Sequence, residues 1–154
     1  MDFVNIFITF SGRINRAKYW IAALVYAAIS LVFGVAAYFA DSTAVQTINT
    51  VVTVVLTISS FGVAIKRLHD RNKSGWYVLL FLVAPGILLA LGLLLGTVSG
   101  ESGFGATALW LIAFAILIWA FIELGCLRGS IGQNQYGPDP LAPEVLTPPV
   151  RTHA

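Results

Sequence analysis

The sequence predicts an all-α integral membrane protein: a four-helix bundle with both termini in the cytoplasm and a short N-terminal interfacial segment. Three observations favour this class. Of the 154 residues, 58% are hydrophobic and only 10% are charged, whereas soluble domains average about 25% charged. Four apolar stretches reach the roughly 20 residues that a membrane helix needs. The basic residues flank these stretches on one side only, which indicates a fixed orientation.

The same composition disfavours several other classes of protein. The nine Lys and Arg and seven Asp and Glu are too few to cover the surface of a soluble domain of this length. Cys126 is the single cysteine, so an internal disulfide framework is excluded. A water-soluble enzyme, a disordered protein and a disulfide-stapled secreted domain are therefore all disfavoured.

The chain reads as one membrane domain, residues 1–140, with spans at residues 19–40, 44–65, 76–98 and 106–127. Continuous apolar runs favour helices over barrel strands, because lipid offers no partner for unpaired backbone groups. The segment before the first span is too short to cross, so we expect it to lie on the inner leaflet. Residues 141–154 are predicted to be a disordered cytoplasmic tail.

The distribution of Lys and Arg predicts the orientation. All nine lie before the first span, between the second and third spans, or after the fourth span. The connections 41–43 and 99–105 contain none. The positive-inside bias therefore places both termini and the middle loop in the cytoplasm.

The second span carries a polar stripe with helical spacing. Its members are Gln46, Thr50, Thr53, Thr57 and Ser60. Hydroxyl groups in such a stripe can line a solute path, but they more often bond to their own helix or to a neighbouring helix. We favour the packing interpretation and keep a small oligomeric transporter or channel-like subunit as the alternative.

Glu123 is the one formal charge inside the predicted spans. An ionised carboxylate is costly in a bilayer, so it is expected to face the bundle interior or a basic partner. It lies four residues before the span ends, or roughly 6 Å from the inner boundary at 1.5 Å per residue. This depth favours a structural ion pair with Arg13, Arg16 or Arg67 over a proton relay.

Three motifs gather on the predicted cytoplasmic side, in residues 10–20, 66–76 and 129–140. Asp70 and Asp139 supply acids that can balance the arginines, and His69 can donate to a carboxylate or a carbonyl. Together they predict a cytoplasmic cap formed by Arg13, Arg16, Arg67, His69, Asp70, Trp76, Asn134, Tyr136 and Asp139.

The cap has two open interpretations. In the first, ion pairs and glycine turns lock the loops and bind no ligand. In the second, the cap contacts anionic lipid headgroups or a protein partner, since each basic residue near an anionic surface contributes about 1 kcal/mol. The basic residues assigned to headgroup contact are Arg13, Arg16, Lys18, Lys66, Arg67, Arg71 and Lys73.

The three motifs, in this order, resemble the Domain of Unknown Function 805 family of small bacterial inner-membrane proteins with about four helices. The resemblance runs from the N-terminal segment to Pro140. It is carried by Phe10, Gly12, Arg13, Arg16, Tyr19 and Trp20, by Arg67, Leu68, His69, Asp70, Ser74, Gly75 and Trp76, and by Gly132, Asn134, Tyr136, Gly137, Pro138, Asp139 and Pro140. It implies a multi-pass inner-membrane location and brings no reaction, substrate or catalytic residue.

We therefore expect a non-enzymatic binding or scaffold protein. Its candidate protein partners are further copies of itself, as a homo-oligomer, or another membrane protein. His69 and Asp70 are adjacent in sequence, which does not make them a catalytic dyad. No metal-ligand spacing or phosphate-binding loop is visible, so no catalytic, metal or cofactor residue is predicted. Nucleic-acid binding is not expected, because the basic residues are tied to span ends.

Overall fold

The computed structural model describes residues 3–40, 42–99 and 103–142. Over these residues the chain forms helices and no strand. The elements are α1 (Phe3–Ile8), α2 (Arg16–Phe39), α3 (Thr43–Asp70), the π-helix η1 (Leu79–Val83), α4 (Ala84–Ser99), α5 (Phe104–Ala120) and the π-helix η2 (Phe121–Cys126). The predicted all-α class is confirmed, and the tail from residue 143 lies outside the described residues.

Four helical segments are long and apolar enough to cross a membrane: Arg16–Phe39, Thr43–Asp70, Leu79–Val98 and Phe104–Cys126. They correspond to the four predicted spans. The largest difference is at the second span, which continues as helix through Asp70 instead of ending at residue 65. The apolar run ends before this last turn, and the turn stays helical because neighbouring elements bind its charged side chains.

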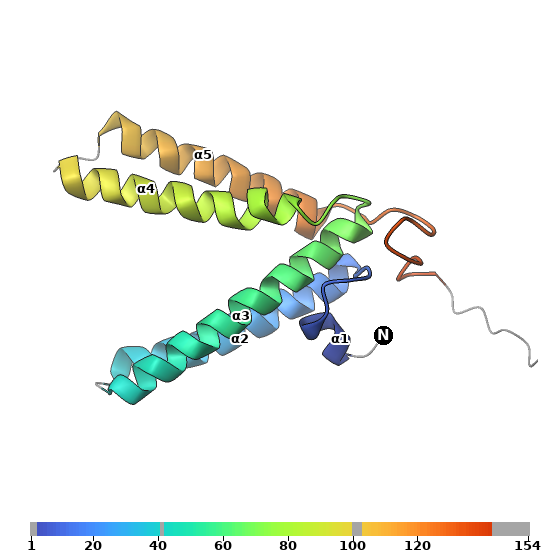
Figure 1. Ribbon diagram of the computed structural model, residues 1–154, viewed down its shortest axis with the longest axis horizontal. Helices are drawn as coiled ribbons and strands as arrows, with labels where there is room; N and C mark the ends of the chain where they lie inside the picture. Colours follow the sequence, from blue (N-terminus) through green and yellow to red (C-terminus); the bar gives the residue numbers. More distant parts are fainter. Residues whose placement is uncertain (1–2, 41, 100–102, 143–154) are drawn as a thin grey trace, which may run out of the picture.

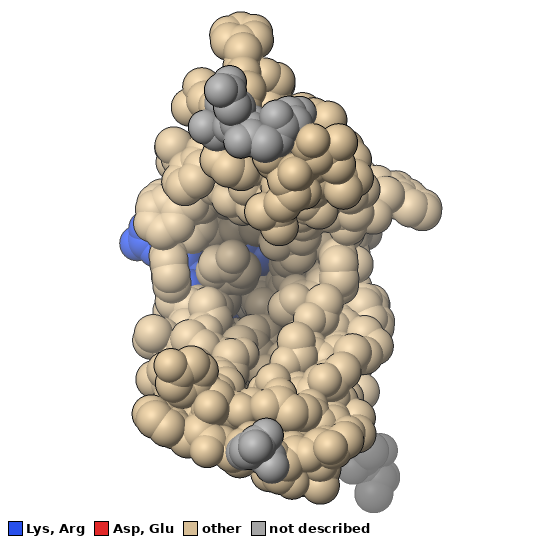
Figure 2. Space-filling model, turned by 90° about the vertical axis from the view of Figure 1, so that its left-hand side faces the viewer, with Lys and Arg blue, Asp and Glu red and all other residues tan. Residues whose placement is uncertain are grey.

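The helices form two hairpins, α2 with α3 and α4 with α5 (Figure 1). The hairpins meet at the end that holds the 71–78 loop and the C-terminal segment, and they diverge towards the opposite end. We call the meeting end the cap end. The predicted bundle is therefore closed only there, and Figure 2 shows an open hollow between the hairpins with mostly uncharged walls.

A hydrophobic core joins the two hairpins at the cap end. Its buried members are Ala64, Leu68, Val78, Phe81, Ala120 and Leu124. Phe81 is in η1 and packs edge-on against Trp119 of α5, with ring centroids 5.1 Å apart. The π-helical turn ends at Val83, two residues before Pro85. Proline has no N–H to donate to the carbonyl one turn earlier, so the regular helical pattern is interrupted here.

The N-terminal segment is a short helix docked on the α2–α3 hairpin (Figure 1). Ile6 of α1 is buried with Ile14, Ala22 and Val63 in a second apolar cluster. The sequence predicts only that this segment lies on the membrane surface, and the structure adds that one side of it packs against protein. This contact fixes the chain that leads into α2.

A glycine allows close packing of α4 on α5, and the hydroxyl groups of α3 bond within their own helix. Gly92 of α4 packs against Trp110 of α5 so closely that an added Cβ would collide with the indole. In α3, Thr50, Thr53 and Thr57 each donate to the carbonyl four residues earlier. These bonds favour the packing interpretation of the polar stripe, because the hydroxyl protons are already used within the helix.

Candidate functional site

Asp70 lies at the centre of the cap end and is only 2% exposed. Its Oδ1 accepts hydrogen bonds from Arg13 Nε and Nη2 at 3.2 and 3.1 Å. Its Oδ2 accepts from Arg67 Nη1 at 2.5 Å. A buried carboxylate needs paired charges and hydrogen bonds to offset its desolvation, and Asp70 has both. The motif acid and the two motif arginines thus form one buried ion-pair triad.

Arg67 also binds the end of the fourth span. Its Nε donates to the Leu124 carbonyl at 2.7 Å, and its Nη2 donates to the Leu127 carbonyl. Trp20 of α2 donates from Nε1 to the Gly125 carbonyl at 3.0 Å. The last carbonyls of a helix have no partner within the helix, and cations favour that end of the helix dipole. These side chains therefore fix η2 against the first hairpin.

Arg13 connects the triad to the C-terminal segment. Its Nη1 donates to the Gly132 and Gly137 carbonyls at 2.7 and 3.2 Å, and its Nη2 donates to the Ser130 carbonyl at 2.6 Å. Gly132 and Gly137 have φ angles of 76° and 132°, a region that glycine enters without steric cost. The glycines thereby let the loop turn its carbonyls towards the guanidinium group.

The C-terminal segment in turn caps α3. Ser130 donates to the Asp70 carbonyl from its backbone N at 2.7 Å and from its Oγ at 3.0 Å. Asn134 donates from Nδ2 to the His69 carbonyl at 2.9 Å. A Cβ at Gly129 would collide with the Asp70 carboxylate. The three sequence motifs therefore interlock around the last turn of α3.

His69 bonds to the first motif and stacks on the third. Its Nδ1 is 3.2 Å from the Gly12 carbonyl oxygen. Because a carbonyl can only accept, Nδ1 carries the proton and donates. The imidazole lies flat on the Tyr136 ring, with centroids 3.8 Å apart and an interplanar angle of 6°. The expected donation to a carbonyl is present, and no hydrogen bond from the described residues reaches Nε2.

Glu123 forms an ion pair, but not with the residues that the sequence analysis expects. Its Oε1 accepts from Arg71 Nε at 3.0 Å and from Lys73 Nζ at 2.9 Å. The expected partners Arg13 and Arg67 are held by Asp70. Because α3 continues to Asp70, the following turn brings Arg71 and Lys73 beside the end of the fourth span.

Asp139 also differs from the expectation, because it forms no ion pair with the described residues. Its Oδ2 accepts from the Gly132 backbone N at 3.0 Å, and its Oδ1 accepts from the Leu141 backbone N at 2.9 Å. The hydrogen bonds from Leu141 and then Gly132 favour the charged form and lower the pKa of Asp139 from its usual 3.8. Asp139 thus closes a turn through its backbone hydrogen bonds, and it contacts no arginine directly among the described residues.

Lys66 is fully buried, although the sequence analysis assigns it to headgroup contact. Its Nζ donates to the carbonyls of Asn5 and Ile6 at 2.8 and 2.5 Å. Both carbonyls lie in the last turn of α1, where cations are favoured. Lys66 therefore anchors the N-terminal helix. Its buried ammonium group donates to that helix and is not placed to bind a lipid headgroup.

The cations at the cap end fall into two sets. The engaged set, whose side chains bind other parts of the chain, is Arg13, Lys66, Arg67, Arg71 and Lys73. The available set is Arg16, Lys18 and Arg128, whose side chains have no hydrogen bond or ion pair to any residue that the structure describes. Arg128 is not among the residues predicted for headgroup contact, although it directly follows the predicted fourth span.

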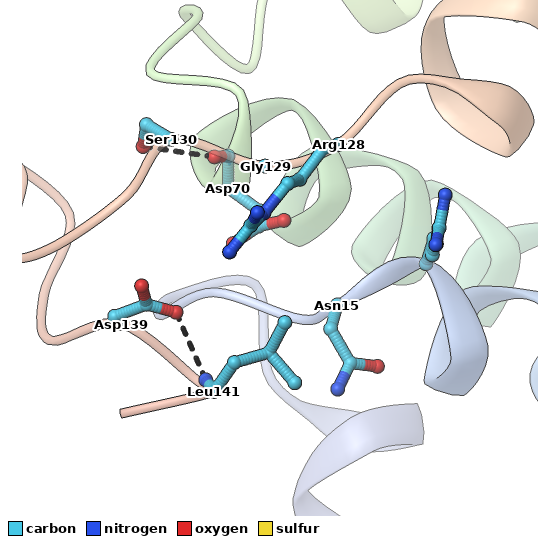
Figure 3. Close-up of a pocket in the computed structure, with 8 residues that line it drawn as sticks. Asn15, Asp70, Arg128, Gly129, Ser130, Asp139 and Leu141 are labelled. Carbon is cyan, nitrogen blue, oxygen red and sulfur yellow. Dashed lines mark hydrogen bonds between the residues drawn. The ribbon is translucent and has the colours of Figure 1, made fainter. Parts of the chain in front are cut away.

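The available set surrounds two neighbouring cavities that share Asp139. One, of about 180 Å³, is lined by Arg16, Arg128, Asn15 and Ser130 among others. Figure 3 shows the Arg128 side chain extending into the space between Asp70 and Asp139. The other, of about 560 Å³, includes Lys18 in its lining. The available set thus lines two cavities next to the buried triad.

Comparison with known proteins identifies the family. The profile described as "Protein of unknown function (DUF805)" matches residues 7–138. The chain belongs to this family. Among its relatives, "Uncharacterized protein YiiR" of Escherichia coli K12 is 32% identical over 133 residues, covering 85% of each chain. "Inner membrane protein YhaH" of the same strain is 26% identical over 137 residues, covering 87% of this chain and 88% of the relative.

A third relative, "Inner membrane protein YhaI" of Escherichia coli K12, is 25% identical over 134 residues, with 87% of each chain covered. No solved structure matches the chain. The DUF805 family is thus one of uncharacterised multi-pass inner-membrane proteins, and the four membrane-length helices agree with that location. The matched region includes the Arg13–Asp70–Arg67 triad and the loop that binds it.

Proposed function

We propose that this DUF805 chain is a non-enzymatic membrane protein that binds the phosphate of anionic lipid headgroups through Arg16, Lys18 and Arg128. One observation supports this proposal above the others. These three cations line cavities at the cap end, and their side chains have no partner among the described residues. The side chains of the engaged set, in contrast, bind carboxylates and carbonyls of the chain itself.

The electrostatic surroundings favour an anion. The Asp70 carboxylate in the cavity wall is already bound by two guanidinium groups, so it repels an incoming phosphate little. Asp139 is the other acid in the wall and keeps its charge, but the three cations of the available set outnumber it. Guanidinium groups match phosphate oxygens in a forked geometry, which suits Arg16 and Arg128.

The position along the helices favours a lipid as the source of the phosphate. Arg16 and Lys18 are in the first turn of a membrane-length helix, and Arg128 follows the end of another. Trp20 lies one turn further along α2 and donates to the end of the fourth span. Tryptophan near the ends of spans is typical of headgroup depth, and this supports placing the available set at the level of the lipid phosphates.

The test measures lipid enrichment around the full-length protein. The protein is placed in nanodiscs of mixed phosphatidylglycerol and phosphatidylcholine, and co-purified lipids are counted by native mass spectrometry. At about 1 kcal/mol for each basic residue, removal of one cation lowers the preference for the anionic lipid about fivefold. The triple variant Arg16→Gln, Lys18→Gln and Arg128→Gln should therefore lose most of its phosphatidylglycerol enrichment.

A charge-retaining variant provides the control. Arg16→Lys with Arg128→Lys keeps the net charge and should retain more of the enrichment than the glutamine variant. All variants should have the same thermal denaturation midpoint as the wild-type protein. The reason is that none of the three side chains has a hydrogen bond or ion pair to a described residue. Unchanged phosphatidylglycerol enrichment in the glutamine variant would contradict the proposal.

A further inference from the structure

A third cavity lies at the cap end, and none of the available cations lines it. It has a volume of about 400 Å³ and is lined by His69, Ser74, Gly75, Trp76, Leu79 and Tyr136, among others. We infer that this cavity binds the free hydroxyl end of an uncharged membrane lipid of the diacylglycerol type, with His69 Nε2 accepting the hydrogen bond.

His69 has one ring nitrogen that donates and one that can accept. Its Nδ1 must carry the proton because the atom 3.2 Å away is the Gly12 carbonyl oxygen, which only accepts. In the neutral imidazole, Nε2 is therefore an acceptor, and no hydrogen bond from the described residues reaches it. Stacking on Tyr136, with ring centroids 3.8 Å apart, prevents the ring from turning away.

A glycine keeps the space in front of Nε2 open. Gly75 lies opposite this nitrogen, and a Cβ at Gly75 would be 3.4 Å from Nε2 and 3.0 Å from Ile65 Cγ2. Any side chain at position 75 would therefore crowd the space in which a ligand atom must sit to reach Nε2. The absence of a side chain at this position leaves the acceptor accessible from the cavity.

The acceptor at Nε2 and the uncharged lining of the cavity restrict the chemistry of the ligand. A phosphate diester offers only acceptors, which would face the lone pair of Nε2. An ammonium group is disfavoured because the residues that line the cavity include no carboxylate to pair with its charge. The residues lining the cavity carry no formal charge with His69 neutral. A neutral hydroxyl donor satisfies all of these conditions.

We expect the ligand to enter from the exposed side of the cavity. Trp76 and Leu79 line the cavity and are 77% and 48% exposed. Leu79 begins the third membrane-length segment, so the cavity adjoins the surface that faces lipid. Apart from His69, Ser74 and Tyr136, the named lining is apolar or glycine, which suits the acyl-linked part of a lipid.

The experiment uses full-length protein in phosphatidylcholine nanodiscs with ¹⁵N-labelled histidine. The chain has two histidines, and a His153→Ala variant assigns the signals. Titration with 1,2-dioctanoylglycerol should shift the bare Nε2 resonance of His69 in a saturable way. Trioctanoylglycerol, in which the hydroxyl group is esterified, should leave this resonance unchanged.

A variant that fills the cavity supplies the control. Gly75→Ala should weaken the dioctanoylglycerol response at least tenfold, while the resonance of the free protein keeps the same tautomer. A protonated Nε2 in the wild-type protein, an equal response to both lipids, or a response undiminished in Gly75→Ala would each overturn the inference. None of these outcomes depends on Arg16, Lys18 or Arg128, so this test is separate from the test of phosphate binding.

Discussion

The two ends of the α2–α3 hairpin differ sharply in how they are held. All seven buried residues of α3 lie between Gly62 and Asp70, and three of them, Lys66, Arg67 and Asp70, are charged. From Thr43 to Phe61 no residue of α3 is buried. The buried residues of α3 are thus concentrated at the cap end, and the opposite end presents apolar and hydroxylated side chains to its surroundings.

This difference reflects what holds membrane helices together. Lipid tails are as apolar as leucine, so burial of apolar surface gives helices no drive to associate inside the bilayer. At the cap end, buried charges and orphan helix carbonyls supply directional contacts instead. The long apolar segments place the chain in the membrane, and the cap end determines how its helices are joined.

The largest effect should follow from removal of the Arg67 guanidinium. Arg67→Leu leaves the Leu124 and Leu127 carbonyls without this donor and takes one cation from buried Asp70. Breaking a buried ion pair costs about 3–5 kcal/mol. The measurement is the free energy of unfolding in bicelles with increasing sodium dodecyl sulfate.

Arg128→Leu is the matched control for this experiment. It removes the same guanidinium from a side chain with no described partner, so the unfolding curve should stay close to that of the wild-type protein. Equal destabilisation by both variants would remove the distinction between the engaged and available sets.

A smaller effect is expected at the second ion pair. Glu123→Gln removes the charge that Arg71 and Lys73 share across the junction of the fourth span and the 71–78 loop. Hydrogen bonds to charged groups contribute about 1.5–3 kcal/mol, so a loss near the lower end of that range is expected by the same unfolding assay. A stability equal to that of the wild-type protein would show that this ion pair does not help to hold the cap end.

Outside the cap end, the close contact of α4 with α5 gives a comparable but local test. Gly92→Ala places a methyl group against the Trp110 indole, and overpacking of this kind costs about 1–3 kcal/mol. Gly96→Ala is the control, because a Cβ there meets nothing within 4 Å. Trp110 fluorescence in a variant whose other tryptophans are replaced should change only for Gly92→Ala.

The smallest effect concerns acidification at Asp139. Its pKa is lowered in the folded chain, so its stabilising contribution is present above the usual value of 3.8 and is lost as pH falls through the folded value. Amide exchange at Gly132 and Leu141 should therefore accelerate, relative to the intrinsic rate, below that pH. Asp139→Asn should abolish this pH dependence, and its persistence in the variant would assign the effect to another group.

The fold class follows from the sequence because its cause is local. Twenty consecutive apolar residues force a helix in lipid regardless of their neighbours, so the four spans are recognised without tertiary information. The far end of the second span is different. Lys66 and Arg67 interrupt the apolar run, and partners that are 57 to 61 residues away in sequence help to keep them in a buried helix.

The cap residues are predictable as a group, but their partners are not. Motif composition identifies Arg13, Asp70 and His69, whereas the choice of acid for each arginine depends on tertiary geometry. Glu123 lies close enough in depth to several cations that sequence alone cannot select Arg71 and Lys73. The availability of Arg128 is likewise a property of the assembled cap end, since it depends on which other cations find partners.

The central claim is that Asp70 and its arginines form one buried folding contact. A double-mutant cycle with Arg13→Gln and Asp70→Asn in the bicelle unfolding assay tests this claim most directly. We predict that the double variant is less destabilised than the sum of the single variants, with a coupling energy of at least about 1 kcal/mol. Strictly additive losses would contradict the claim, because they would mean that the two side chains do not stabilise the chain through each other.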